Sequence, residues 1–235
     1  MKVGVVVALE DEARALLPRG DLPHRMTIPI GASLALRICG MGPERAAAAA
    51  RALLAEGATS LVSCGLAGAL APGLAPGTLL LPEQVSFLGS RRVVDLSWRR
   101  RIAQRLTPDA GPAASLLLTL KEPVVTALAK ARMHRETGAA AVDMESGAVL
   151  GVAAEAGVPG LVLRAVVDAA ETTLPQAAMA GLGGREQPAG AAVALSLLRR
   201  PWELAALMRL SSNLRAATQC LRRTWLQLGP EGLVP

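Results

Sequence analysis

Histidine and cysteine are scarce in this sequence, and their spacing does not favour a metal site. The 235 residues include two histidines, His24 and His134, and neither has a partner at a ligand-like spacing. The three cysteines, Cys39, Cys64 and Cys220, form no CxxC pair. We therefore expect no bound metal. We also expect reduced thiols that behave as small apolar residues, as in a cytosolic protein.

Aromatic residues are also rare, and the chain has no tyrosine and a single phenylalanine. The net charge is +6, but the arginines are scattered without aromatic residues between them. This pattern does not favour nucleic-acid binding, and a basic face toward anionic lipid is the better prediction. No uncharged apolar run reaches the roughly 18–20 residues that a membrane-spanning helix needs. Met1-Lys2 leads into a short apolar run followed by acids, so we expect no signal peptide and a cytoplasmic location.

Apolar runs alternate with helix-like stretches up to about residue 167. This alternation predicts an α/β fold, a single domain with a mixed, mostly parallel central sheet flanked by helices. After Pro175 the pattern becomes helical, so we divide the chain into an α/β domain over 1–180 and a helical C-terminal extension over 181–235. Strands are expected near 2–8, 33–39, 60–64, 78–81, 115–120, 140–143 and 160–167, and helices near 10–17, 43–56, 98–106, 124–136 and 145–156.

Carboxylates follow three of the predicted strands. Asp143 and Glu145 stand where a strand gives way to a helix of small residues, Asp168 ends the apolar run from residue 160, and Glu12 lies just past the first strand. The carboxyl ends of parallel strands are where α/β proteins bind ligands, and a carboxylate there suits a vicinal diol such as that of ribose. The alternatives stay open: each of the first three acids could cap a following helix, and Glu12 could be a solvated acid of a first helical turn.

Five segments share their order and spacing with a known family. They are MKVGVVVALEDEARAL (1–16), CGMGPERAAAAARALL (39–54), SLVSCGLAGALAPGLAPGTLLLPEQV (60–85), VDMES (142–146) and LRAVVDAA (163–170). Together they resemble the nucleoside phosphorylase and nucleosidase superfamily, in particular the adenine-releasing nucleosidases. The resemblance covers most of the chain and implies a nucleoside phosphorylase-like fold and cleavage of the N-glycosidic bond of a purine nucleoside. We also expect a homo-oligomer.

Cleavage of such a bond requires a protonated leaving base, a stabilised oxocarbenium-like sugar and a nucleophile behind C1. By resemblance, Asp168 is the general acid that protonates the purine at N7, and Glu12 is the base that activates water. Glu145 is the ribose-binding carboxylate, and Asp143 is a further substrate contact beside it. Met144 matches the apolar residue beneath the sugar, although a core methionine would look the same.

Two glycine-containing turns supply further candidates. The turn at 40–42 precedes a helix whose N-terminal N–H groups could bind an anion, and phosphorolytic relatives hold phosphate near such a turn. In the family, serine or threonine more often stands at the position of Leu66. The absence of that hydroxyl group favours hydrolysis, but water and inorganic phosphate both stay open as nucleophiles. No other cofactor is expected. Without an aromatic residue for stacking, the base is expected between aliphatic side chains, including Val125. The candidate contacts in the turns are Gly42, Leu66, Ala67 and Gly68.

A closer resemblance rests on residues 174–217. LPQAAMAGLGGREQP (174–188) and LSLLRRPWELAALMRLSSNLRAA (195–217) look like the hopanoid-associated phosphorylase family, which removes adenine from adenosylhopane. This resemblance implies a lipid-linked purine nucleoside as substrate, in hopanoid biosynthesis. One alternative is a soluble nucleosidase for a small adenine nucleoside such as methylthioadenosine or S-adenosylhomocysteine. Another is a non-catalytic lipid- or nucleoside-binding protein, which the intact Glu12, Glu145 and Asp168 argue against.

The segment 195–228 carries apolar residues at helical spacing with arginines among them. This pattern suits an interfacial helix pair that meets an anionic membrane, here the inner face of the membrane. A helix packed on the domain or on another subunit fits the pattern equally well. The arginines are Arg199, Arg200, Arg209, Arg215, Arg222 and Arg223.

Overall fold

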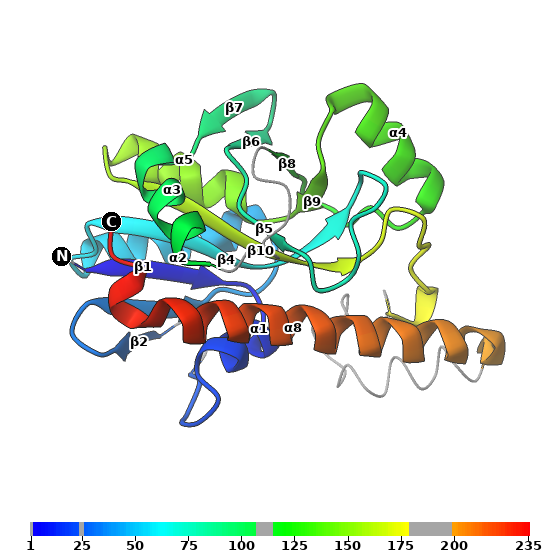
Figure 1. Cartoon of the computed structure of the whole chain (residues 1–235), viewed down its shortest axis with the longest axis horizontal. Coiled ribbons are helices and arrows are strands. Elements are labelled where there is room, and N and C mark those ends of the chain that lie inside the picture. The colour runs from blue at the N-terminus through cyan, green and yellow to red at the C-terminus, as the bar shows by residue number, and fades with distance from the viewer. Residues whose placement is uncertain (1, 24–25, 107–114, 179–198) are drawn as a thin grey trace.

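The computed structural model describes residues 2–23, 26–106, 115–178 and 199–235. These residues form a mixed sheet with helices on both faces (Figure 1), which confirms the predicted α/β class. The strands are β1 (Val3–Val7), β2 (Thr27–Ile30), β3 (Leu34–Ile38), β4 (Ser60–Ala69), β5 (Leu79–Leu80), β6 (Gln84–Phe87), β7 (Ser90–Val93), β8 (Leu116–Thr119), β9 (Ala141–Asp143) and β10 (Gly160–Asp168). The helices are α1 (Glu10–Leu16), α2 (Pro43–Ala55), α3 (Leu96–Arg105), α4 (Ala127–Thr137), α5 (Ser146–Glu155), the 3-10 turn η1 (Pro201–Glu203) and α8 (Leu204–Gly232).

The centre of the sheet is parallel. β1 pairs in parallel with β3 and with β4, and β4 pairs in parallel with β10. The far end of β4 also pairs with β9, which runs antiparallel to it and continues the sheet through β8 and β6 to β7. The carboxyl ends of β1, β4 and β10 therefore lie together, and β9 meets them there.

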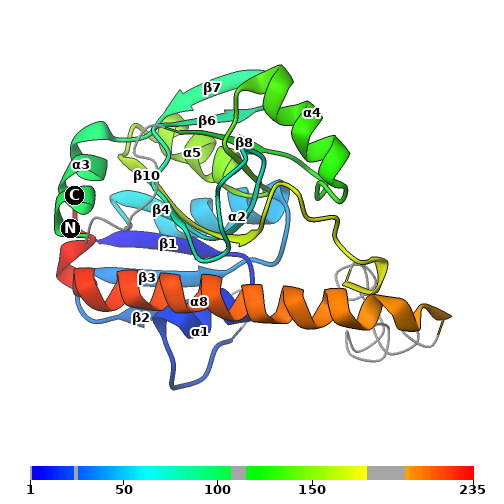
Figure 2. The same cartoon turned by 45° about the vertical axis from the view of Figure 1, so that its right-hand side comes forward.

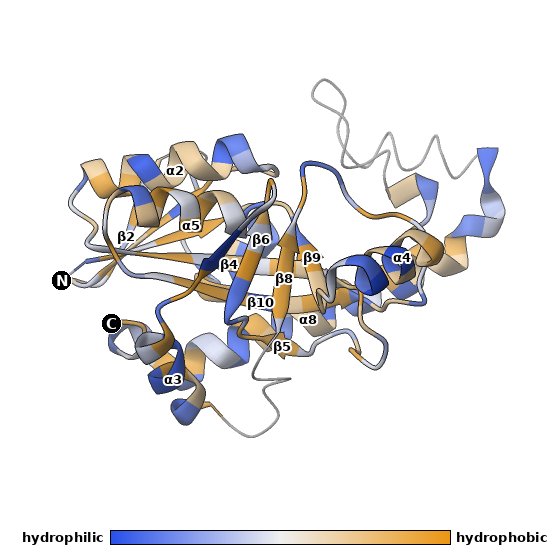
Figure 3. Cartoon of the chain, turned by 90° about the horizontal axis from the view of Figure 1, so that it is seen from above, coloured by the Kyte–Doolittle hydropathy of each residue, from blue (hydrophilic) through white to orange (hydrophobic). Residues whose placement is uncertain are grey.

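Two hydrophobic layers flank the sheet because its central strands are apolar on both faces. On one face, alternate residues of β1 such as Val3 and Val5 pack with α1, α3 and α8. On the other face, Val6 packs with α2 and α5, which also contact each other. Figure 3 shows that hydrophobic residues gather on the strands, whereas α3 and α4 carry many hydrophilic residues. The apolar runs in the sequence therefore correspond to strands buried between helices.

The predicted strands and helices up to residue 168 are all present, but the prediction missed β2, β6 and β7. β2 is a short edge strand that contains Pro29, a residue normally found in edge strands because it cannot donate a ladder hydrogen bond. β6 and β7 form a hairpin whose turn residues Leu88 and Gly89 have φ values of 49° and 75°. Two positive φ values are typical of a tight hairpin turn that usually carries Asn-Gly. With leucine at the first position, the sequence lacks the Asn-Gly pair from which a hairpin is predicted.

The C-terminal extension is helical, as predicted, over its described part. The expected helix pair over 195–228 begins outside the described residues and stays a prediction. Beyond η1 the described chain is the helical stretch α8, which runs along the domain and has a kink with non-helical backbone at Gly229. Its second half is the packed half, whereas its first half extends past the sheet (Figures 1 and 2). The predicted boundary at residues 180/181 lies outside the described residues and stays a prediction. The buried residues of α8 are Ala217, Cys220, Leu221, Thr224, Leu228 and Gly232.

Candidate active site

A cavity of about 260 Å³ lies where β1, β4 and β10 end. Four carboxylates that the sequence singled out line it: Glu12 from α1, Asp143 from β9, Glu145 from the start of α5 and Asp168 from the end of β10. The remainder of the wall is mostly aliphatic, so the polar groups are concentrated on one side of an apolar space. The aliphatic wall includes Leu9, Met41, Leu66, Met144, Val167, Leu174, Leu210 and Leu214.

Glu12 is buried, with 2% of its surface exposed, so it is not a solvated helix acid. Its Oε2 accepts hydrogen bonds from the backbone N–H groups of Ala8 (2.7 Å) and Leu9 (2.9 Å), and its Oε1 accepts one from Leu66 (2.8 Å). Burial raises the pKa of the Glu12 carboxyl, while the nearby Arg164 charge and the three hydrogen bonds oppose that rise. These bonds fix both carboxylate oxygens, and a raised pKa strengthens the group as a base.

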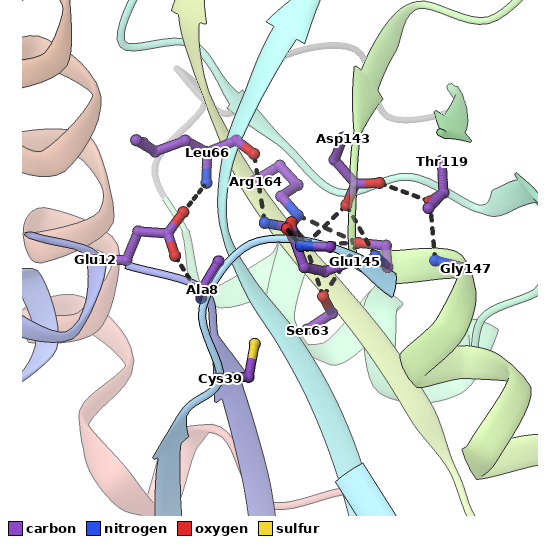
Figure 4. A network of polar contacts seen from close by, with 12 residues as sticks. Ala8, Glu12, Cys39, Ser63, Leu66, Thr119, Asp143, Glu145, Gly147 and Arg164 are labelled. Carbon is purple, nitrogen blue, oxygen red and sulfur yellow. Dashed lines mark hydrogen bonds and ion pairs between the residues drawn. The ribbon is translucent and has the colours of Figure 1, made fainter. Parts of the chain in front are cut away.

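Arg164 lies at the centre of the polar network and is 1% exposed (Figure 4). Its Nη2 lies 2.7 Å from Asp143 Oδ2 and 3.5 Å from Glu145 Oε2. Nη2 also donates to Ser63 Oγ at 2.8 Å, and Nη1 donates to the backbone oxygen of Leu66 at 3.3 Å. The guanidinium therefore ties β10 to β4, β9 and the start of α5, and it compensates two buried carboxylates.

Asp143 and Glu145 have different surroundings. Asp143 accepts a hydrogen bond from Thr119 Oγ1 (2.6 Å) and one from the backbone N–H of Ser146 (3.0 Å), so it also caps α5. Glu145 makes no capping bond to α5; instead its Oε1 accepts a hydrogen bond from Gly42 N–H at 3.0 Å. Burial raises the pKa of Glu145 to about 7, although the Arg164 charge lowers it. Asp143 is thus largely committed to structure, whereas Glu145 retains accepting capacity toward the cavity.

Asp168 pairs with a buried lysine rather than capping a helix. Lys130 Nζ donates to Asp168 Oδ2 and also to the backbone oxygens of Ala169 and Thr172, each at 2.9 Å. Burial raises the pKa of the Asp168 carboxyl, and the Lys130 charge opposes this rise. An acid with a raised pKa is what protonation of a leaving base requires.

Two glycines of β4 make room for the acids. A Cβ added at Gly65 would overlap both Glu12 Oε1 and Arg164 Nη1, and one at Gly68 would lie 3.2 Å from Asp168 Oδ1. Gly65 therefore allows Glu12 and Arg164 to approach the same stretch of β4. The small-residue pattern of this strand follows from the close approach of charged side chains to its backbone.

Comparison with family models adds a decisive finding, because the model described as "Phosphorylase superfamily" matches residues 2–199. The chain belongs to the phosphorylase superfamily. No curated protein matches the chain.

Solved structures confirm the superfamily fold. S-adenosylhomocysteine nucleosidase from Streptococcus pyogenes, in complex with 5-methylthiotubericidin, superposes with a TM-score of 0.72 at 19% identity, covering 100% of this chain and 98% of that one. The 5′-methylthioadenosine/S-adenosylhomocysteine nucleosidase from Neisseria meningitidis, in complex with methylthio-immucillin-A, gives 0.71 at 17% identity and 99% coverage of both chains. Futalosine hydrolase of Helicobacter pylori strain 26695 gives 0.70 at 17% identity, covering 97% and 96%.

Most of the predicted substrate contacts of this superfamily member line the cavity. Met144, Leu66, Ala67 and Gly68 do so directly, whereas Gly42 contacts the site through Glu145. The position of Val125 is a correction, because this residue does not line the cavity and its neighbour Val124 does. Leu174 N–H donates to the backbone oxygen of Val125, so the backbone of Val125 is bound to a residue of the cavity wall.

Sequence analysis missed the polar residues that support the acids. Arg164 is a single charge in the middle of an apolar strand, and Lys130 is the buried residue of an otherwise exposed or half-buried helix. The signal for Arg164 was present, because a charge inside a strand buried on both faces needs a buried partner. Lys130 gave no such signal, since a lysine on an amphipathic helix normally faces solvent. The missed neutral partners are Ser63, Thr119 and Ser146.

Replacing Arg164 by methionine should destabilise the protein by about 3–5 kcal/mol, because two buried carboxylates lose their cation. Urea unfolding measures this change. Arg51→Met, which breaks an exposed ion pair with Glu155, is the matched control and should change stability by less than about 1 kcal/mol.

Without Arg164 the folded pKa of Glu145 rises further above its unfolded value. A group whose folded pKa lies above its unfolded pKa stabilises the folded protein at low pH, and this contribution is lost as pH rises through the folded pKa. The stability that Arg164→Met loses relative to the wild type should therefore become smaller in acid. A loss no larger than that of Arg51→Met would contradict this account.

Proposed function

We propose that this chain is a hydrolytic nucleosidase that releases adenine from an adenine nucleoside. The observation that carries the proposal is the joint placement of Asp168, Glu145 and Glu12 around one mostly apolar cavity. Cleavage of an N-glycosidic bond needs an acid for the leaving base, an acceptor for the ribose diol and a base for the nucleophile. The superfamily membership supports the same reaction class.

The proposed reaction assigns one step to each acid. Asp168 transfers its proton to N7 of adenine as the bond between C1 and N9 breaks, so the base leaves as a neutral molecule. Glu145 accepts hydrogen bonds from the ribose hydroxyls and stabilises the positive charge that develops on the sugar. Glu12 takes a proton from the water that attacks C1. The aliphatic walls beside these acids exclude bulk water, which strengthens each electrostatic contact.

Water is favoured over phosphate because no arginine or lysine is among the described residues that line the cavity. Arg45 stands beside the glycine turn at 40–42, outside this lining. The N–H of Gly42, at the start of α2, already binds Glu145. Arg164 is paired with Asp143 and Glu145, and Lys130 is paired with Asp168. The cavity wall also carries five carboxyl groups, and those that are ionised would repel inorganic phosphate. They belong to Glu12, Glu122, Asp143, Glu145 and Asp168.

The apolar wall supports a substrate with a large apolar 5′ group. Leu210 and Leu214 of α8 and Leu174 line the cavity together with Met41, and adenosylhopane carries a hydrocarbon at this position. The second candidate is a nucleosidase for methylthioadenosine or S-adenosylhomocysteine, which the similarity of the fold to nucleosidases named for these nucleosides favours. A non-catalytic binding protein is disfavoured, because burial of three acids in one cavity is costly without a chemical role.

Incubation with adenosylhopane and, separately, with methylthioadenosine tests both candidates. We expect adenine release from adenosylhopane at the same rate with and without phosphate, and a free sugar as the second product. A sugar 1-phosphate would overturn hydrolysis. Turnover of methylthioadenosine alone would establish the second candidate, and no adenine from either nucleoside would overturn the proposed reaction.

A lipid-linked substrate must be reached at a bilayer, and the first half of α8 fits that task. Met208 of α8 is 67% exposed, and Trp202 of the preceding turn η1 is 73% exposed. Arginines stand near both residues in the sequence. Within the described residues, no helix is long and apolar enough to span a membrane. Surface contact is therefore the proposed mode, and each arginine near an anionic surface contributes about 1 kcal/mol.

Charge reversal at four arginines should abolish binding to anionic liposomes. The wild-type protein is expected to co-sediment with these vesicles, less so at high salt. The variant should stay in the supernatant yet still cleave a short-chain or detergent-solubilised adenosine analogue. Equal sedimentation of both proteins would exclude the membrane role and favour a packing or subunit contact. The four positions are Arg199, Arg200, Arg209 and Arg215.

A further inference from the structure

Lys130 is a buried cation that the proposed reaction does not use. Its side chain is fully buried, although the other residues of α4 are exposed or half-buried, and Leu128 is 77% exposed. Burying an ammonium group costs several kcal/mol unless charged and polar partners surround it. A lysine in this position therefore needs an explanation beyond anchoring a surface helix.

The contacts of Lys130 use all of its donors. Nζ donates to Asp168 Oδ2 and to the backbone oxygens of Ala169 and Thr172. Three acceptors match the three N–H groups of an ammonium ion, whereas a neutral amine has only two. Lys130 is therefore charged, and it fixes both the carboxylate and the chain that follows β10.

This arrangement divides the two oxygens of Asp168 between two tasks. Oδ2 is bound by Lys130, while Oδ1 has no hydrogen-bond partner among the described residues. Oδ1 lies on the side of Gly68, whose added Cβ would come within 3.2 Å of it, and both residues line the cavity. The oxygen that is left free is thus the one available to a ligand.

We propose that Lys130 is a positioning residue, which orients Asp168 so that Oδ1 meets the leaving base and sets the pH range in which Asp168 acts as an acid. The inference rests on the proposed function, because it takes Asp168 as the proton donor. The carboxyl group of Asp168 holds its proton less tightly beside the Lys130 ammonium group than it would without that charge. The proton therefore passes more readily to N7 of the leaving base.

The charges around Asp168 decide the sign of the pH effect. Burial raises the pKa of Asp168, and Lys130 is the charged group among the described residues that lowers it. The other acids of the cavity come from separate elements: Glu12 from α1, Asp143 from β9, Glu145 from α5, and Glu122 from the segment before α4. Removing Lys130 leaves burial unopposed, so the pKa rises. Because the acid form is the active form, the alkaline limb of the kcat profile must move to higher pH.

The test compares Lys130→Met, Lys130→Arg and Arg132→Met. Arg132 lies on the same helix in an exposed ion pair with Glu136, so its loss removes a charge from α4 without touching Asp168. With 5′-octylthio-5′-deoxyadenosine as probe, Lys130→Met should shift the alkaline limb upward by ~1–3 pH units and lower kcat. Lys130→Arg should keep the limb near the wild-type pH, and Arg132→Met should change neither quantity. An unshifted limb in a folded Lys130→Met protein would overturn the proposal.

A second probe separates the acid role from a structural one. The leaving group of 4-nitrophenyl β-D-riboside departs as a stable anion and needs no proton, so Lys130→Met should slow this substrate far less than the adenine nucleoside. An equal loss with both substrates would mean that Lys130 acts only on the structure.

The titration of Asp168 can be measured without substrate, so it tests the role of Lys130 independently of the proposed function. Carboxyl carbon-13 NMR of aspartate-labelled protein, assigned through Asp168→Asn, follows the titration of Asp168 directly. Its midpoint should rise in Lys130→Met, even for a protein that releases no adenine. An unchanged midpoint would overturn the inference whatever the substrate, while an inactive wild-type protein with a shifted midpoint would overturn only the proposed function. If Lys130→Met does not fold, the wild-type midpoint should equal that of Lys130→Arg, and a difference above one pH unit would contradict charge control.

Discussion

Asp168→Asn should lower kcat for adenine release by ~10²–10⁴-fold, the range that general acid catalysis typically supplies. Asparagine keeps the size of the side chain, and its carbonyl oxygen can still accept the hydrogen bond from Lys130. It carries no acidic proton, so adenine would have to leave as an anion. Release of adenine from the nucleoside, followed at pH 7, measures the loss, and KM should change far less than kcat because the shape of the cavity is preserved.

Asp95→Asn is the matched control for this prediction. Asp95 caps α3 by accepting a hydrogen bond from Trp98 N–H at 2.8 Å, and it lies outside the cavity. Asparagine caps helices as well as aspartate does, so this variant should keep wild-type kcat and stability. If Asp168→Asn also keeps wild-type kcat, the proton donor lies elsewhere in the protein.

Most of the fold was predictable because its central strands are continuous apolar runs. Such runs signal strands buried on both faces, and β1, β4 and β10 are of this kind. The strands that escaped prediction lie at an edge of the sheet or next to one, where few residues are buried and the pattern is weak. The β6–β7 hairpin shows the point, because its turn uses Leu88 at a positive φ where the usual signal is asparagine.

The location of the site was predictable for a topological reason. Acids at or just past the carboxyl ends of parallel strands share one edge of the sheet. Glu12, just past β1, and Asp168, at the end of β10, accordingly line one cavity. What the sequence did not reveal is which cation accompanies which acid. Arg164 is 21 residues from Asp143, and Lys130 is 38 residues from Asp168. Side-chain pairs at such separations depend on how the helices pack, and periodicity carries no information about that packing.

The same limit applies to the proposed preference for water over phosphate, because this proposal rests on contacts that the sequence does not show. The glycine turn at 40–42 looked like an anion site from its sequence alone. In the fold, the anion it holds is Glu145, a carboxylate of the chain itself. A turn that resembles an anion site in the sequence therefore contacts a carboxyl group of the chain itself in the structure.

Glu12→Gln should lower kcat by ~10²–10⁴-fold if Glu12 is the base that activates water. Glutamine lacks the negative charge, so position 12 would no longer provide a base that accepts a proton from the attacking water. The substitution also has a structural cost, since both oxygens of Glu12 accept hydrogen bonds from backbone N–H groups and the amide NH2 would face one of these donors. Thermal unfolding must therefore accompany the rate measurement. Glu10→Gln, at the exposed start of the same helix, is the control and should keep wild-type activity.

Azide distinguishes loss of a base from loss of structure. This anion attacks C1 without giving up a proton, so it needs no base and is smaller and less charged than phosphate. In Glu12→Gln, azide should restore turnover and yield the 1-azido sugar, because Asp168 still protonates the departing adenine. In Asp168→Asn, azide should restore nothing, because the step that has failed there is departure of the base. A folded Glu12→Gln protein that azide does not rescue would remove Glu12 from the role of base, and an unimpaired one would show that water is activated by another group of the cavity.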